Sequence, residues 1–262
     1  MSSASKVHVR CQRRRRALSV TDAAMGVRSG DILLLRSAPS ISSYLIMRAQ
    51  GHNAYSHIAV VVRNPATRVP YVLSTVATGY FAEETKLRDV FGRDGTTGAR
   101  MYTFDDYVRS YVRAGGQVAL RVLTPSLDDK RAWQWALRVH GHPYPRVPWV
   151  QLPGAYFSRH APSALSTAAQ GEAFLAEREL HCAALVAAAY QHFGVVRART
   201  HDRPLAHWLP CDFSERDAHL LDPRLAERGY ALSAEVRVVV VPSVDETCNA
   251  ARGERAPAGS ES

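Results

Sequence analysis

Cys182 is the side chain that the sequence places best for nucleophilic chemistry. It begins an alanine-rich segment that stops at Gly194, and this pattern predicts a helix. Backbone N–H groups and the helix dipole at a helix start lower the pKa of a thiol, which favours the reactive thiolate. The alternative interpretation is that Cys182 is a packing residue, because cysteine is among the most frequently buried side chains.

A thiolate nucleophile requires an imidazole base that a third polar group holds in place. His57 opens an apolar run over residues 57–62, so its ring stands at the mouth of a predicted strand. The next predicted strand, over residues 71–76, carries Ser74 and Thr75 in an otherwise apolar run. Side chains alternate along a strand, so only one of these two hydroxyls can face His57.

The sequence indicates neither a metal site nor a cofactor site. Cys11 and Cys248 fall in predicted tails, Cys211 follows Pro210 in a loop, and no pair of cysteines has the CxxC spacing. Several histidines accompany Cys182 in the chain, but their spacing matches no regular zinc pattern. These histidines are His52, His57, His140, His142 and His181.

The elements that must position these side chains form an α+β domain. Aliphatic content predicts strands, which cover residues 32–35, 57–62, 71–76, 117–123 and 235–241. Composition and capping residues predict helices, which cover residues 41–48, about 126–140 and 182–193. Four prolines make residues 141–153 a loop. We expect an antiparallel sheet packed against the helix that carries the nucleophile.

Charge and composition divide the chain into three zones. The net charge of the chain is +9, but residues 1–20 carry six basic side chains and no acid. Residues 21–262 therefore have a net charge of only +3. We therefore predict a basic disordered tail over residues 1–28, a folded domain over 29–241 and a disordered tail over 242–262. A nucleic-acid groove across the domain is excluded. The run Arg13–Arg16 is either a solvated tail or a weak contact for an anionic surface.

Short motifs follow one another in a recognisable order. They are Gly30-Asp31-Ile32, Tyr55-Ser56-His57-Ile58, Tyr71-Val72-Leu73-Ser74-Thr75, His142-Pro143-Tyr144, His181-Cys182-Ala183-Ala184-Leu185-Val186, Leu209-Pro210-Cys211-Asp212-Phe213 and Gly229-Tyr230. In this order they resemble the circularly permuted NlpC-type papain-like superfamily. The most similar members are the YiiX-like bacterial proteins and homologues in poxviruses and other large DNA viruses.

The resemblance implies a permuted papain-like fold with a Cys-His active site. Cys182 would be the nucleophile, and His57 would be the general base and later the acid. In the strand after the histidine, Ser74 stands where the bacterial relatives carry a polar residue. The resemblance therefore implies that Ser74 is the third group of the site, which orients the His57 ring. Many relatives carry an acid near this position, which this chain lacks, and Glu83 or Glu84 could substitute from the next segment.

Two function classes follow from the resemblance. The first is a cysteine-dependent hydrolase (peptidase or amidase) or acyltransferase that works through a thioester on Cys182. Its substrate would be an amide or ester of a peptide, a peptidoglycan fragment or a lipid. The second is a catalytically degenerate binding or virion-associated protein with the same fold, which the missing acid favours.

The expected location is the cytoplasm, or the host-cell cytoplasm or virion if the protein is viral. No stretch approaches the roughly 20 apolar residues of a membrane-spanning helix, and the N-terminus lacks the apolar core of a secretory signal. We therefore expect neither a transmembrane segment nor secretion by a signal peptide.

Overall fold

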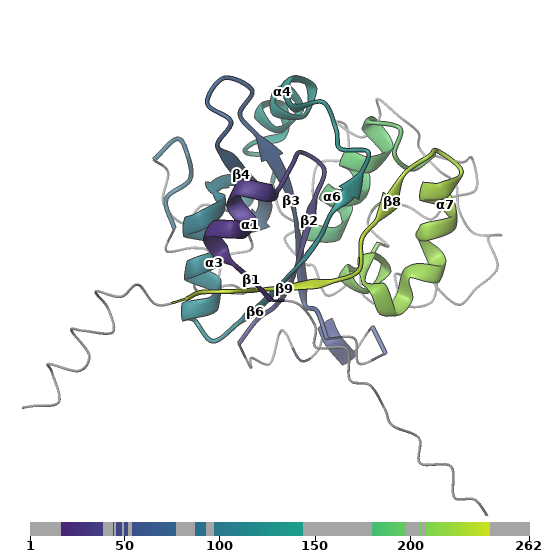
Figure 1. Cartoon of the computed structure of the whole chain (residues 1–262), viewed down its shortest axis with the longest axis horizontal. Helices are drawn as coiled ribbons and strands as arrows, with labels where there is room; N and C mark the ends of the chain where they lie inside the picture. The colour runs from purple at the N-terminus through teal and green to yellow at the C-terminus, as the bar shows by residue number, and fades with distance from the viewer. Residues whose placement is uncertain are drawn as a thin grey trace, which may run out of the picture.

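The computed structural model shows a central sheet with helices on both faces (Figure 1). It describes residues 17–38, 44, 46–48, 50–51, 54–76, 87–92, 97–143, 180–197, 205 and 208–241. Most of the two predicted tails is outside the described residues. The parts concerned are residues 1–16, which include the Arg13–Arg16 run, and residues 242–262. Half of the helix expected over residues 41–48 and most of the predicted proline-rich loop also lie outside it.

Seven strands form one sheet in the order β1-β9-β6-β2-β3-β4-β5. They are β1 (Ala17–Ser19), β2 (Ile32–Arg36), β3 (His57–Arg63), β4 (Pro70–Val76), β5 (Gly98–Thr103), β6 (Gln117–Arg121) and β9 (Val236–Val239). Neighbouring strands are antiparallel except β1 and β9, which run parallel. The predicted α+β class with an antiparallel sheet is thus confirmed in its coarse form, and β1 and β5 add to the predicted strands.

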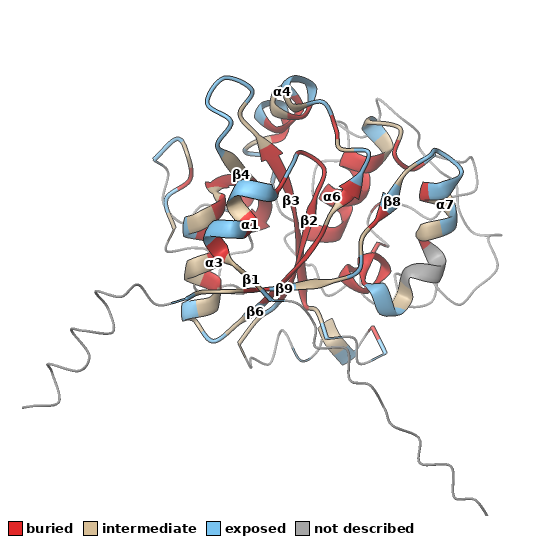
Figure 2. Cartoon of the chain, in the orientation of Figure 1, coloured by how far each residue is buried: buried red, intermediate tan, exposed pale blue. Residues whose placement is uncertain are grey.

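Strands β2 and β3 are continuous apolar runs because both of their faces are covered. Ile32 and Leu34 join the core on one side of the sheet, whereas Leu33 and Leu35 join the core on the other side. All four side chains are completely buried, and β2 and β3 lie in the red interior of Figure 2. A strand buried on both faces shows no alternation of apolar and polar residues.

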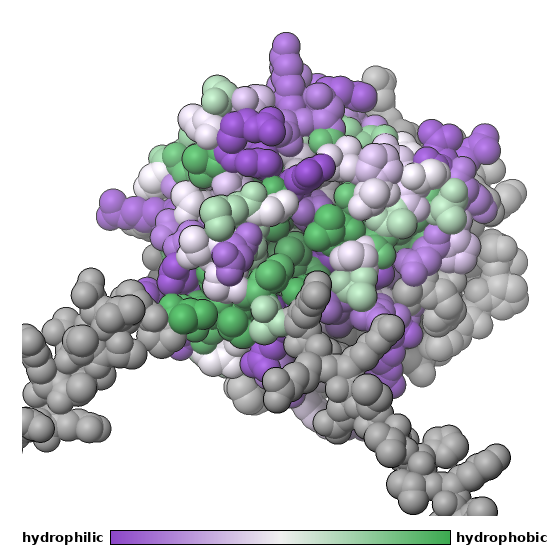
Figure 3. Space-filling model, in the orientation of Figure 1, coloured by the Kyte–Doolittle hydropathy of each residue, from purple (hydrophilic) through white to green (hydrophobic). Residues whose placement is uncertain are grey.

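Two of the helices in the described ranges lie on each face of the sheet. On one side lie α1 (Val20–Gly26) and α3 (Phe104–Arg113), and on the other lie α4 (Asp129–Val139) and α6 (Cys182–His192). Asp128 lies in the predicted capping region and accepts the backbone N–H of Arg131 at 2.8 Å. Helix α4 buries Ala132 and Trp135, while hydrophilic residues cover its outer face in Figure 3. This amphipathic pattern orients α4 on the sheet.

Short elements that follow β6 in the chain extend the core around α6. They are β7 (Leu123–Thr124), paired with β8 (Ala231–Leu232), the 3-10 helices η4 (Pro210–Phe213) and η5 (Glu215–Leu220), and α7 (Asp222–Ala226). Arg121 is 2% exposed, and its guanidinium donates to the carbonyl oxygens of Phe213 at 2.7 Å and Ser233 at 2.8 Å. These bonds satisfy a buried cation and tie the short elements to β6.

The N-terminal boundary of the folded domain requires correction. Strand β1 and helix α1 fall within residues 17–28, for which the sequence predicts part of a disordered tail. Strand β1 pairs with β9, and the side chains of Val20, Ala23 and Val27 are buried. The segment was missed because a three-residue strand and a seven-residue helix are too short to show a clear apolar period.

None of the helices in the described ranges is long and apolar enough to cross a membrane.

Removing residues 1–28 should destabilise the protein, because the deletion takes away three buried apolar side chains and the edge strand β1. We expect the free energy of unfolding to fall by about 3 to 5 kcal/mol, measured by urea denaturation. Deletion of residues 1–16 is the control, since it keeps both elements, and it should leave the urea midpoint near that of the full chain. Equal midpoints for the two deletions would show that β1 and α1 contribute nothing to the fold.

Candidate active site

Cys182 is the first residue of α6, the helix that packs against β3 and β4. Every residue of α6 from Cys182 to Tyr190 is buried, which explains why alanine dominates the segment: small side chains let the helix approach the sheet closely. His181 caps the helix, with its Nδ1 atom accepting the backbone N–H of Ala184 at 3.5 Å. The thiol is thus fixed at a helix start, as predicted, and it is 7% exposed.

His57 is the first residue of β3 and is completely buried. The antiparallel register places it opposite Leu35 of β2. Its Nε2 atom lies 2.8 Å from the Oγ atom of Ser74 on β4. The positive charge of the His57 ring lowers the pKa of the Cys182 thiol, so the two side chains are electrostatic neighbours. The structure therefore brings the three predicted site residues into one connected group.

The hydroxyls of Ser74 and Thr75 have different surroundings, as strand alternation requires. Ser74 bonds His57, whereas the Thr75 hydroxyl is buried with no hydrogen-bond partner among the described residues. The Ser74 Oγ atom also accepts a hydrogen bond from the phenol of Tyr107 at 3.0 Å. Tyr107 is a completely buried residue of α3. The group His57, Ser74 and Tyr107 therefore connects the thiol on α6 to the helical layer on the other side of the sheet.

Opposing effects set the pKa of Cys182. Burial raises it, because a thiolate loses its hydration in the protein interior. The positive charge of His57 lowers it most, and the neighbouring side chain of His181 lowers it further. The net result is a pKa lowered to about 6. At neutral pH the sulfur is mainly a thiolate, which is the nucleophilic form of cysteine.

Tyr107 is the residue of this group that the sequence did not reveal. It lies in a helix whose buried residues Phe104, Tyr107, Val108 and Tyr111 have the spacing of an ordinary apolar stripe. Its ring packs beside those of Tyr102 and Tyr111, which is typical of core aromatics. Only the position of its hydroxyl in three dimensions distinguishes it, and no sequence signal reports that position.

The other candidates from the sequence have different roles or lie outside the described residues. Cys211 is buried, and its backbone N–H donates to the Gln50 side chain at 2.8 Å. His140 bonds the buried carboxylate of Asp89 at 3.0 Å. Cys11, Cys248, His52, Glu83 and Glu84 are outside the described residues. Within the described ranges, no group of three or more His, Cys, Asp or Glu side chains could hold a metal ion.

Comparisons with known proteins give little support for a family. No protein-family model matches the chain, and neither does any curated protein. Among solved structures, the chain is similar to the crystal structure of the metalloprotein yiiX from Escherichia coli O157:H7, DUF1105, with 17% sequence identity and a TM-score of 0.37. That match covers 64% of this chain and 66% of the other. It is a weak structural neighbour and decides neither family nor function.

Alkylation of Cys182 should follow its thiolate fraction. Because the pKa is lowered to about 6, we expect the iodoacetamide rate at Cys182 to rise through pH 6 and level off by neutral pH. His57→Ala removes the main charge that stabilises the thiolate, so the midpoint should move upward toward that of an ordinary thiol. Peptide mapping measures the rate at Cys182 alone. An unchanged midpoint in His57→Ala would disprove the coupling of thiol and imidazole.

Ser74→Ala and Tyr107→Phe should lower the alkylation rate at pH 6 by about 2- to 10-fold, with Ser74→Ala the stronger. Ser74→Ala removes the hydrogen bond to the His57 ring, and Tyr107→Phe removes the hydrogen bond that positions Ser74. Neither change removes a charge. Tyr111→Phe is the matched control: Tyr111 also lies on α3 and is buried, but its hydroxyl bonds Ser37 at 2.6 Å. If Tyr111→Phe slowed alkylation as much as Tyr107→Phe, the effect would come from the helix as a whole.

Proposed function

We propose that this protein is a cysteine-dependent hydrolase or acyltransferase that forms a thioester on Cys182. One observation carries the proposal: a thiol at a helix start whose pKa is lowered to about 6, chiefly by a buried histidine. A purely structural cysteine in an apolar core would instead have a raised pKa. A lowered pKa at a buried thiol is typical of nucleophilic sites.

We also propose that the fold is the permuted NlpC-type papain-like arrangement. The support is the order of the elements along the chain. The strand that carries His57 comes first, the strand with the orienting hydroxyl second, and the helix that carries Cys182 later. In this order the thiol, the imidazole and Ser74 still meet in space.

The proposed reaction begins with the Cys182 thiolate and the protonated ring of His57. The sulfur attacks the acyl carbon of an amide or ester, and the carbonyl electron pair moves to oxygen. When the tetrahedral intermediate collapses, His57 gives its proton to the departing amine or alcohol, and a thioester remains on Cys182. Water or a second nucleophile then attacks the thioester while His57 removes its proton. Release of the acyl product restores the thiolate and the imidazolium.

Ser74 is the point at which the site departs from a triad with a carboxylate. A hydroxyl can accept from the Nε2–H of an imidazolium and can also donate to the Nε2 lone pair of a neutral ring. The bond from Tyr107 holds the Ser74 oxygen in place for either state. It adds no negative charge, so the imidazolium of His57 is less stabilised than it would be beside an acid.

The substrate class and compartment belong to the same proposal. We expect an acyl group of a peptide, a peptidoglycan fragment or a lipid, all of which carry a suitable amide or ester. A site that depends on a thiolate suits a reducing compartment, and neither Cys182 nor Cys211 forms a disulfide. The cytoplasm, or the host-cell cytoplasm or virion for a viral protein, meets this requirement.

The second candidate function is a binding or virion-associated protein with a degenerate site. The neutral Ser74 in place of an acid favours it, since removing an orienting acid lowers rates by orders of magnitude in triad enzymes. The two functions differ in one observable, because a binding protein accumulates no acyl group on Cys182.

Cys182→Ser should abolish acylation by p-nitrophenyl acetate, a small activated ester, because the thiolate is the attacking group. We expect the unaltered protein to gain one acetyl group on the Cys182 peptide, measured by mass spectrometry, and to release p-nitrophenol. His57→Ala should slow the reaction by about 100-fold or more. Cys211→Ser is the matched control and should react normally.

The absence of an acyl group on Cys182 in the folded protein would contradict the enzymatic proposal. Ser74→Asp then separates the two candidates. A sharp gain in acylation would show that a missing acid limits an enzyme site, whereas no gain would favour the binding protein.

A further inference from the structure

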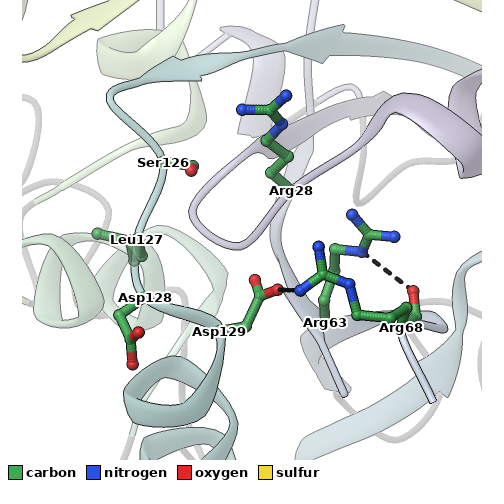
Figure 4. A pocket seen from close by; sticks show the side chains of 7 residues that line it. All are labelled: Arg28, Arg63, Arg68, Ser126, Leu127, Asp128 and Asp129. Carbon is green, nitrogen blue, oxygen red and sulfur yellow. Dashed lines mark hydrogen bonds and ion pairs between the residues drawn. The ribbon is translucent and has the colours of Figure 1, made fainter. Parts of the chain in front are cut away.

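A second polar site lies at the far end of β3 from the thiol. A cavity of about 610 Å³ opens there. Its polar lining comes from the segment between α1 and β2, from the end of β3 and the hairpin after it, and from the segment that leads into α4 (Figure 4). The polar lining residues are Arg28, Arg63, Arg68, Ser126, Asp128 and Asp129. Arg63 ends β3 and His57 begins it, so the strand separates the two places by about 20 Å.

The two carboxylates of this cavity already have partners. Asp129 accepts the Ser29 hydroxyl at 2.7 Å and forms an ion pair with Arg68 at 3.0 Å. Asp128 caps α4 by accepting the backbone N–H of Arg131 at 2.8 Å. In Figure 4 the Asp128 side chain points away from the three arginines, whereas Asp129 points toward Arg68. The charge of Asp129 is therefore neutralised by Arg68, and the carboxylate of Asp128 does not face the arginines.

The positive charges of Arg28 and Arg63, which line the cavity, are not neutralised by a carboxylate among the described residues. Arg63 is held in place by a hydrogen bond from its Nε atom to the carbonyl oxygen of Arg68 at 3.0 Å, which leaves its terminal N–H groups for another acceptor. Among the described residues, no carboxylate lies within ion-pair distance of Arg28 or Arg63. Asp31 is near enough to attract Arg28, but its oxygens accept backbone N–H groups of Arg28 and Leu123.

We propose that this cavity binds a small phosphate-bearing anion through Arg28 and Arg63. Guanidinium groups donate two parallel hydrogen bonds to phosphate oxygens, and this geometry makes arginine the preferred partner of phosphate. The half-buried hydroxyl of Ser126 supplies a further polar group on the cavity wall. The volume lies within the range of small-molecule sites, so an organic phosphate of nucleotide size would fit. This binding is independent of the thioester chemistry proposed for Cys182.

Titration of inorganic pyrophosphate into the full chain by isothermal calorimetry tests the proposal, at about 50 mM salt to limit screening. We expect Arg28→Gln and Arg63→Gln each to weaken binding about 10-fold or more. The corresponding Lys variants keep the charge but lose the two-pronged geometry, so their losses should be intermediate. Asp129→Asn should strengthen binding, because it removes a negative charge and releases Arg68.

Two full-length controls identify the site of binding. Arg237→Gln removes an exposed arginine of β9, away from the cavity, and should leave the affinity unchanged. Replacing all four of Arg13–Arg16 by glutamine should also leave it unchanged. If this second variant lost binding while Arg28→Gln and Arg63→Gln retained it, the anion would bind the N-terminal run and the proposal would be overturned.

Citrate tests the chemical class of the ligand. Citrate binding as tight as that of pyrophosphate would overturn the assignment to phosphate. Thermal unfolding of each variant separates loss of binding from loss of fold. Full binding by a folded Arg28→Gln, Arg63→Gln double variant would also refute the proposal.

Discussion

The pairing of β3 with β2 and β4 is the constraint on which the candidate site depends. β3 is hydrogen-bonded on both edges and buried on both faces, so its register cannot slip without moving apolar side chains out of both cores. That register fixes His57 at the end of the strand and Ser74 on the neighbouring strand within 2.8 Å. The helix that carries Cys182 packs on the same pair of strands, β3 and β4. The positions of thiol, imidazole and hydroxyl therefore follow from sheet geometry rather than from loops.

Burial and charge act against each other throughout this group. A completely buried histidine and a nearly buried thiol both lose hydration, and each is tolerated because the other supplies the opposite charge. The neutral Ser74 hydroxyl, which Tyr107 holds in place, bonds the Nε2 atom of the ring without adding a third charge to the interior. The site thus trades the stronger stabilisation that a carboxylate would give for a lower cost of desolvation.

The sequence predicts the parts of this site that depend on pattern. An isolated polar residue in an apolar strand indicated His57, and a helix start indicated Cys182. Tyr107 was not predictable, because its role depends on one hydroxyl in a helix that otherwise shows an ordinary core stripe. β5 was missed because Arg100 interrupts its apolar run; this buried arginine pairs with Asp89 at 3.3 Å and donates to the carbonyl oxygen of Thr97 at 3.4 Å. Both omissions concern side-chain contacts between different segments of the chain, which the local pattern of residues does not report.

The parallel pairing of β1 with β9 has a consequence for how the chain folds during synthesis. β9 lies between β1 and β6, so β1 has no place in the sheet until β9 has been made. Ala17 is synthesised long before Arg237, the residue with which it pairs. The interior strands β2, β3 and β4 can assemble as soon as they emerge, since they are neighbours in sequence. Closure of this sheet edge therefore follows the assembly of β2, β3 and β4, because it must wait until β9 has been synthesised.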